Sequence, residues 1–382
     1  MKYLLLIATS IMLIACNTTP ISTATYMVKL NPSGELKLPL DKSSKFSPFT
    51  IQYLLDNDKQ YLLTTNSFKK SIDVYDLDKV LLHKRIFIND SIREYQQNLQ
   101  GFWAIGADTI LTYSQFKLGY TLLVLDNFEV KNRSTVMINN PETGNAVFNH
   151  ASMTVSPSAV VGGSIYFSEL PMADISKLVT TDYSPEIVYD IKSQKVRTSG
   201  IYWPEVYQNG RWGDLFLFTK TYDNQNRIIY SWQASPDLMV NEHDSIYTIK
   251  ASSDFFERPI QYDPSLVNAE GRDKNYIVQN QYMAVLYDQF RKVYYRYAIH
   301  GIPEDLGNGY EAQVFDKPFS IIILDESFKK IGETLFEGGQ YLPKDSFIGK
   351  EGLYISKHNR RQYEELGEDQ MVFELMKLRI NE

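Results

Sequence analysis

Cysteine is almost absent from this chain, which has a single one, Cys16, among 382 residues. A disulfide needs two cysteines, so no internal disulfide can stabilise the fold and its stability must come from packing. Positive charge is also in short supply, because 39 basic side chains face 46 acidic ones and the formal net charge is −7. Proteins that bind nucleic acid usually present a basic surface to the phosphates, so nucleic acid is not an expected partner.

Motifs of catalysis and of metal binding are missing as well. The five histidines lie far apart and at none of the spacings typical of metal ligands; they are His83, His150, His243, His300 and His358. No nucleophile elbow, phosphate-binding glycine loop or dinucleotide fingerprint occurs. Ser-x-x-Lys occurs at Ser67–Lys70 and Ser327–Lys330, but both copies fall at predicted turns rather than at a helix start. The sequence predicts no metal, no cofactor and no catalytic residue, and it favours a protein that is not an enzyme.

No Gly/Ser-rich or Pro-rich linker divides the chain, although its length would allow two or three domains. Aromatic residues make up 13% of it, with 27 Tyr and 20 Phe, and both residue types are enriched in strands. We expect one β domain over residues 25–382.

The N-terminal segment is an apolar run from Tyr3 to Ile14 that ends in Ala15 and Cys16. This pattern is typical of a bacterial lipoprotein signal, with residues 1–15 removed, Cys16 lipidated and residues 16–24 serving as a tether. The alternatives are a transmembrane helix, which needs about 20 apolar residues, and a plain secretory signal. The apolar run is too short for a transmembrane helix. A lipid on Cys16 would anchor the protein permanently to a membrane.

Sorting within the cell envelope depends on the residues after Cys16. Asn17 stands where an aspartate would indicate retention at the inner membrane, and no acidic run follows it. We expect an outer-membrane lipoprotein that faces the periplasm.

A repeated pattern runs along the rest of the chain: an apolar strand that ends in an acidic or polar residue, a turn, and a Lys-rich strand. Six units are expected, near residues 47–88, 97–138, 150–197, 211–252, 280–337 and 340–380. Four-strand units of this size are typical of a β-propeller. A seventh blade stays open, because residues 198–212 and 255–280 could contain strands. A pair of β-sandwiches or a β-helix is the rival architecture.

The last unit lacks an outer strand after Ile380, and the strand-like segment from Thr25 to Leu30 has no partner nearby in the sequence. We expect this N-terminal strand to complete the final blade, which would close the ring and remove an exposed edge.

The stretch from Tyr287 to Tyr297, the lipobox before Cys16 and the segment from Gly352 to Ser356 resemble a family of uncharacterised lipoprotein propellers of Bacteroidetes that contain a domain of unknown function. This resemblance covers nearly the whole chain after the signal. It implies a propeller related to TolB-like and six-bladed NHL-like folds. It implies no activity, because the family has no established catalytic residues to carry over.

The candidate ligand-binding residues are Tyr294, Arg296 and His300, together with Arg211 and Trp212. On a strand, the first three share one face. Central propeller strands are covered on both faces, so Arg296 must be paired or must open onto the central channel. The structural alternative is an arginine that joins neighbouring blades. Trp212, with Trp103, Trp203 and Trp232, could stack on sugars or fill the wedges between blades.

These observations favour a non-enzymatic binding or scaffolding lipoprotein that holds a peptide, glycan or protein partner at the envelope. The alternative is a periplasmic lyase or hydrolase with a site at the mouth of the central channel, since propellers can assemble a site from distant loops. A sensor or assembly factor is a third possibility, and it would need an exposed apolar patch.

Overall fold

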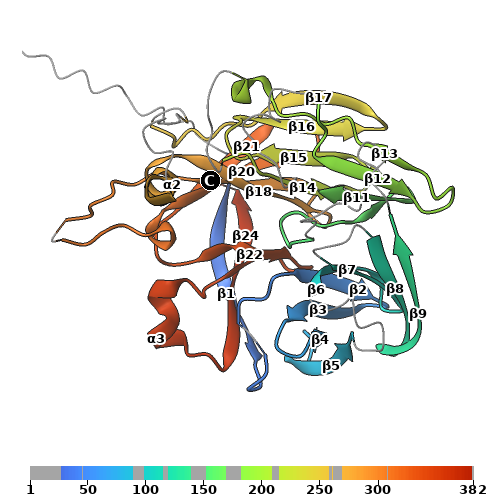
Figure 1. Cartoon of the computed structure of the whole chain (residues 1–382). Helices are drawn as coiled ribbons and strands as arrows, with labels where there is room; N and C mark the ends of the chain where they lie inside the picture. The colour runs from blue at the N-terminus through green and yellow to red at the C-terminus, as the bar shows by residue number, and fades with distance from the viewer. Residues whose placement is uncertain are drawn as a thin grey trace, which may run out of the picture.

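The computed structural model describes residues 27–44, 46–88, 99–114, 119–138, 152–168, 182–208, 215–257, 260, 269–307 and 309–380. Strands dominate these ranges (Figure 1). Two helices, α2 (Ala269–Val278) and α3 (Tyr363–Leu366), and three 3₁₀ turns, at Glu205–Tyr207, Val314–Asp316 and Arg360–Gln362, lie in connections between strands. Within the described ranges, no helix is long and apolar enough to span a membrane.

Four sheets contain four strands each, hydrogen-bonded in chain order. The first contains β2 (Ile51–Asp56), β3 (Lys59–Asn66), β4 (Ser71–Asp76) and β5 (Leu81–Phe87). The second contains β6 (Leu99–Gly106), β7 (Thr109–Ser114), β8 (Gly119–Asp126) and β9 (Glu129–Met137). The third contains β10 (Val160–Val161), β11 (Ser164–Ser168), β12 (Glu186–Asp190) and β13 (Val196–Thr198). The fourth contains β14 (Phe218–Tyr222), β15 (Ile228–Trp232), β16 (Asp237–Glu242) and β17 (Ser245–Lys250).

A fifth sheet has eight strands, which form a fifth and a sixth group of four. The fifth group is β18 (Gln281–Asp288), β19 (Val293–Ile299), β20 (Phe319–Asp325) and β21 (Lys330–Phe336). The sixth is β22 (Leu342–Ile348), β23 (Leu353–Ser356), β24 (Gln370–Ile380) and the N-terminal β1 (Val28–Pro39). The two groups meet at one parallel pair, Val28 with Gly332.

The N-terminal strand therefore pairs as the sequence predicts. β1 runs antiparallel to β24 from Val28 opposite Ile380 to Pro39 opposite Gln370, and Figure 1 shows the blue first strand beside the red last one. The six predicted units coincide with the six groups of strands. The described parts of residues 198–212 and 255–280 contain a 3₁₀ turn and α2 rather than further strands.

The hydrophobic core consists of clusters between consecutive groups. Clusters join the first group to the second, the second to the third, and so on to the sixth. A further cluster joins the sixth group to the first, and it includes Leu38 and Phe373 on one side and Ile51 and Tyr75 on the other. The contacts between groups thus form a closed cycle, and the fold is an all-β, propeller-like one.

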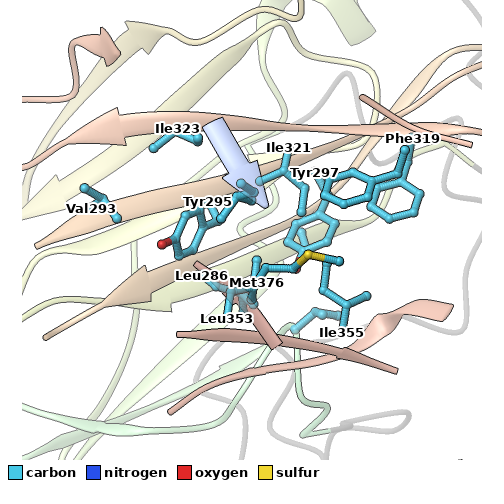
Figure 2. Packing of buried hydrophobic residues seen from close by; sticks show 14 of the residues in the cluster. Leu286, Val293, Tyr295, Tyr297, Phe319, Ile321, Ile323, Leu353, Ile355 and Met376 are labelled. Carbon is cyan, nitrogen blue, oxygen red and sulfur yellow. The ribbon is translucent and has the colours of Figure 1, made fainter. Parts of the chain in front are cut away.

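The cluster between the fifth and sixth groups shows how these wedges are filled. Figure 2 shows Tyr295, Tyr297 and Phe319 from the fifth group beside Leu353 and Ile355 from the sixth. Tyr297 and Phe319 stack with ring centroids 6.1 Å apart. Large aromatic side chains bury much apolar surface each, which explains why a chain without disulfides is so rich in Tyr and Phe.

The connections divide the molecule into two faces. Tight turns join β2 to β3 and β8 to β9, where Asn57 and Asp58, and Asn127 and Phe128, all have positive φ; this conformation suits the twist of a two-residue hairpin. Successive connections in an antiparallel sheet lie at opposite ends. The longer β1–β2, β19–β20, β21–β22 and β23–β24 connections therefore share the other face, which we call the long-connection face. The face with the tight hairpins is the short-turn face.

Candidate functional site

Residues 152–158 lie at the centre of the cycle and contact the strands around it. The Ser152 carbonyl accepts a hydrogen bond from Thr50 Oγ1 at 2.8 Å, and the Ser152 N–H donates to Gln100 O. Val155 O accepts from Lys220 N. These partners belong to the first, second and fourth groups, and all three lie at or near the starts of inner strands.

The other groups are reached by side chains of the same segment. Val155 belongs to the hydrophobic cluster between the fifth and sixth groups, and Ser156 Oγ lies 3.4 Å from Ser168 Oγ of the third. The inner strands start at the long-connection face, so residues 152–158 occupy the mouth of the central axis on that face. The segment brings hydroxyl and apolar side chains there, among them those of Ser152, Val155 and Ser156.

Arg296 on β19 is fully buried and joins the fifth group to the fourth. Its guanidinium has five N–H donors, and five oxygen acceptors surround it. The acceptors are Ser231 Oγ and the carbonyls of Ser235, Pro236, Asp237 and Ala251, at 2.5 to 3.4 Å. The guanidinium carbon also lies 3.7 Å from the ring centroid of Tyr282. Of the two placements that the sequence left open, the structure shows the paired one.

Tyr294, near the start of β19, points to the same neighbouring sheet as Arg296. Its hydroxyl donates to Asp223 Oδ2 at 2.6 Å and accepts from Arg227 Nη2 at 2.9 Å. Arg227 in turn holds Asp223 through Nε at 2.7 Å. These residues lie at the short-turn face, whereas His300 follows the opposite end of β19. The structure therefore places Tyr294 and Arg296 on one face, as predicted, but it does not bring Tyr294 to His300.

His300 is 8% exposed and is connected to a buried carboxylate. Its Nε2 lies 3.0 Å from Ser320 Oγ, and Ser320 donates to Glu333 Oε1 at 2.6 Å. Burial lowers the pKa of His300 to about 4, so the ring is neutral at pH 7. Since a hydroxyl has one proton, His300 donates from Nε2 when Ser320 donates to Glu333.

Glu333 is almost fully buried and has further partners. Ser253 Oγ donates to it at 2.5 Å, the Asp254 N–H at 3.0 Å, and Lys330 Nζ at 2.6 Å. A buried carboxylate is stable only when such donors compensate its desolvation. Lys330 belongs to the second Ser-x-x-Lys motif, and besides Glu333 its ammonium contacts the Ser252 carbonyl and Asp254.

A cavity of about 620 Å³ opens at His300 on the long-connection face. Its apolar wall includes Phe255, Ile302 and Leu335, and the carboxylates of Glu257 and Glu337 also line it. Cavities of this size are typical of small-ligand sites. We call it the His300 cavity.

Lys317 lies just behind this cavity, next to Pro318 in its lining. Its ammonium donates to the carbonyls of Tyr276 at 2.5 Å and Gln279 at 2.8 Å. Burial lowers the pKa of Lys317 to about 7. Two backbone carbonyls are its anchors, so Lys317 fixes the segment that follows α2 and leads into β18.

Trp203 and Trp232 fill the wedge between the third and fourth groups, and Trp103 on β6 of the second group contacts the fourth. Trp232 is fully buried against Trp203, at 5.8 Å between ring centroids, and Trp103 packs on Tyr222 at 5.1 Å. Arg211, Trp212 and the lipidation candidate Cys16 lie outside the described residues. Within the described part of the chain, no group of three His, Cys, Asp or Glu side chains is arranged to hold a metal ion.

Sequence reasoning found His300 but missed Ser320, Glu333 and Lys317, which surround it. None of the three stands in a motif. Strand pairing across β19, β20 and β21 brings Ser320 and Glu333 toward His300, and Lys317 precedes Pro318, whose carbonyl accepts from the His300 N–H.

The family comparison fits this architecture. A family profile described as a domain of unknown function, DUF4221, matches residues 27–335. The chain belongs to the DUF4221 family. A crystal structure of a DUF4221 member from Bacteroides vulgatus ATCC 8482 is similar to it, with 22% sequence identity, a TM-score of 0.78, and 93% of this chain and 99% of that chain covered.

A second structure shares the fold more distantly. It is of a protein from Bacteroides fragilis NCTC 9343 that is classed as exported, with 11% identity, a TM-score of 0.54, and 93% and 96% of the two chains covered. None of the curated proteins matches the chain. At these identities the two structures show a common fold, and the function of this DUF4221 protein has to be argued from its own residues.

Proposed function

We propose that this DUF4221 protein is an envelope lipoprotein, anchored through Cys16, whose single domain is a six-bladed β-propeller. It acts as a non-enzymatic binding or scaffolding module for a peptide, glycan or protein partner. Six blades correspond to the six groups of strands and to the closed cycle of hydrophobic clusters between them. The relation to TolB-like and NHL-like propellers and the location at the outer membrane, facing the periplasm, are parts of the same proposal.

The His300 cavity is the observation that carries this proposal. It offers a concave, partly apolar surface on the long-connection face. The charged groups that could have served catalysis, Arg296 and Glu333 above all, are held by internal partners. Residues 152–158 contact the surrounding groups of strands at the mouth of the central axis. A site that binds without reacting is what these features support best.

The position of β1 determines which face of the domain an anchor on Cys16 would hold toward the membrane. Pro39, its last residue, leads to the long-connection face, so Val28, its first, lies at the short-turn face. A tether that precedes Val28 would leave from the short-turn face. The His300 cavity would then point away from the membrane, where a partner can reach it.

The test is a thermal-shift and calorimetric titration of the full chain in a detergent without sugar headgroups. The ligands are peptidoglycan fragments, oligosaccharides and short peptides. Leu335→Arg introduces a bulky charge at the rim of the cavity, where Leu335 is 46% exposed; Val124→Arg, at a similarly exposed site outside the cavity, is the matched control. Binding that Leu335→Arg abolishes and Val124→Arg preserves supports the proposal. If both variants retain binding, the His300 cavity is not the binding site.

A hydrolase or lyase is the second candidate, because the chain from His300 through Ser320 to Glu333 resembles a proton relay. If this relay acts on a substrate, a ligand found in the screen will be consumed, and His300→Asn will stop its consumption while His243→Asn, in an exposed turn, will not. A ligand recovered unchanged after long incubation with the native protein excludes this candidate.

A further inference from the structure

Each group of strands ends in an outer strand, and all six outer strands lie within the described ranges. They are β5, β9, β13, β17, β21 and β1. The outer edge of such a strand has unpaired backbone N–H and C=O groups, which pair readily with another extended chain. Proteins usually protect these edges with short strands, prolines, charged residues, bulges or a covering element.

Five of the six outer strands have such a protection. β1 contains Pro32 and Pro39, and its register shifts between Pro32 and Glu35. β5 and β9 each contain a lysine and an arginine, and each has a register shift in its pairing. β13 is only three residues long. The pairing of β21 has a register shift as well, and β1 covers its start at Gly332.

β17 has none of these protections. It is six residues long, pairs with β16 without a register shift, and has neither a proline nor a charged side chain before its last residue, Lys250. Its sequence, Ser-Ile-Tyr-Thr-Ile-Lys, is rich in residues that favour strands. Figure 1 shows β17 at the rim of the molecule, where Ile246 is 38% exposed. An extended segment from outside can therefore reach this edge.

The pairing of β16 with β17 shows which backbone groups of β17 point outward. The N–H of Ala251, directly after the strand, donates to Pro236 O. In an antiparallel pair, residues that bond to the neighbouring strand alternate with residues that turn away from it. The residues bonded to β16 are therefore Ser245, Tyr247 and Ile249. The residues whose N–H and C=O groups turn outward are Ile246, Thr248 and Lys250.

The side chains of β17 define what an added strand would meet. Tyr247 and Ile249 pack against the hydrophobic cluster between the fourth and fifth groups, so they offer a fixed apolar surface. Thr248, on the other side, is exposed. Aromatic residues opposite β-branched ones, and Thr opposite Thr, stabilise paired strands. Lys250 has no ion-pair partner among the described side chains, so an acidic residue opposite it would complement its charge.

We propose that β17 binds an extended peptide segment of a partner protein, which adds to the fourth sheet as a fifth, antiparallel strand. An acidic residue of the segment lies opposite Lys250 and an aromatic one opposite Ile249. β-Branched residues lie opposite Thr248 and Tyr247. No described residue in the lining of the His300 cavity belongs to β17, so this inference goes beyond the function proposed for that cavity.

A second copy of the chain fits the edge less well. β17 runs from the short-turn face toward the long-connection face, and Val28, where the described chain begins its first strand, lies at the short-turn face. Two β17 strands paired antiparallel would therefore direct their short-turn faces, and the tethers that precede Val28, in opposite directions. One membrane could not hold both copies by that face.

The experiment is a titration of the full chain, in detergent, with the capped fluorescent peptide Glu-Tyr-Thr-Val-Thr, followed by anisotropy. The first, third and fifth residues of the peptide face Lys250, Thr248 and Ile246. N-methylation of the third residue removes the N–H that bonds to Thr248 O, and it should weaken binding about tenfold. N-methylation of the second residue, whose N–H turns away from β17, is the matched control and should leave the affinity unchanged. Gln in place of the first Glu should weaken binding about threefold.

Two substitutions test the edge from the side of the protein. Thr248→Pro removes an outward N–H that the pairing with β16 does not use, and proline is tolerated at such edge positions. This variant should keep the native melting temperature and lose peptide binding. Thr248→Val keeps the N–H and should bind the peptide as the native chain does. If Thr248→Pro lowers the melting temperature, the two N-methylated peptides decide the question alone.

Three results would overturn the proposal. One is binding that both N-methylated peptides retain, because it would not depend on backbone pairing. Another is the absence of saturable binding of the unmodified peptide to the folded protein. The third is self-association of the native chain, measured by sedimentation, that Thr248→Pro abolishes; it would make β17 an interface between copies. Ligand binding that Leu335→Arg abolishes would in each case leave the function proposed for the His300 cavity intact.

Discussion

The ammonium of Lys220 on β14 lies 2.6 Å from the carboxylate of Glu186 on β12, and the two side chains are 3% and 0% exposed. This pair joins the third sheet to the fourth. The ammonium also donates to the Tyr166 carbonyl at 2.8 Å, and the Tyr230 hydroxyl donates to the other carboxylate oxygen at 2.5 Å. A buried ion pair is costly to break from one side, because the remaining charge has no solvent to compensate it.

Lys220→Met should therefore destabilise the protein by about 3–5 kcal/mol, since Glu186 stays buried without its cation. The double variant Lys220→Met with Glu186→Gln removes both charges and should lose clearly less unfolding free energy than Lys220→Met alone. Urea unfolding followed by fluorescence measures the unfolding free energies of Lys220→Met, of Glu186→Gln and of the double variant. If the double variant loses as much as the single changes added together, the two residues do not act as a pair.

Arg296 is expected to contribute to stability and not to binding. Arg296→Lys keeps the charge but loses the planar fork that reaches Ser231, Ser235 and Ala251, so it should cost about 2–3 kcal/mol. Ligand affinity at the His300 cavity should stay unchanged. Arg197→Ala, at an exposed arginine, is the control. Loss of ligand binding at an unaltered melting temperature would instead give Arg296 the ligand-binding role that the sequence suggested.

Lowering the pH should change the unfolding free energy in opposite directions through two buried groups, His300 and Asp345. The pKa of His300 is lowered by burial to about 4, so between pH 6.5 and 4 only the unfolded chain takes up its proton and the unfolding free energy falls. Burial raises the pKa of Asp345 to about 6, so between pH 6 and about 4 only the folded chain takes up that proton and the unfolding free energy rises. Each contribution amounts to about 3 kcal/mol over its range.

Single substitutions separate these two contributions. Asp345→Asn removes the group that makes the unfolding free energy rise with acid, so the unfolding free energy of this variant should fall more steeply with acid than that of the native protein. His300→Asn removes the group that makes the unfolding free energy fall, so the unfolding free energy of this variant should fall less steeply. Urea unfolding at half-unit steps from pH 7 to pH 4 gives both slopes, and the other carboxylates cancel in the comparison. Parallel slopes for all three proteins would show that neither group is titrated as its burial implies.

The six units were predictable because their signals are local. Each strand shows apolar residues bounded by turn residues such as Asn57 and Asp58, and this pattern depends only on neighbours in the chain. The pairing of β1 was predictable for another reason: the last unit was short by one strand, and the segment before Leu30 had no other partner. The paired state of Arg296 followed in part from its place on a covered strand.

The site around His300 was not predictable in the same way. Ser320 and Glu333 are ordinary strand residues in the sequence, and only the pairing of three strands brings them to the imidazole. The role of residues 152–158 was equally hidden. Their contacts with every group depend on the geometry of the whole cycle, and a short stretch of serine and threonine reads as a loop.

We expect closure of the cycle to depend on β1, and a substitution at Leu38 in this strand tests that dependence. This side chain is fully buried in the cluster with Ile51 and Phe373, between the last group and the first. Leu38→Ala should lower the unfolding free energy by about 2–5 kcal/mol, as cavity-forming changes in cores do. Lys37→Ala, at the exposed neighbour in the same strand, should change it by no more than about 0.5 kcal/mol.

Removal of residues 27–39 goes further, because it leaves the whole length of β24 as an open edge. Unpaired edges associate with other chains, so the truncated protein should aggregate or form dimers through β24. Size-exclusion chromatography with light scattering measures this directly. If the truncated protein stays monomeric and melts at the native temperature, β1 is not needed to close the cycle between the sixth group and the first.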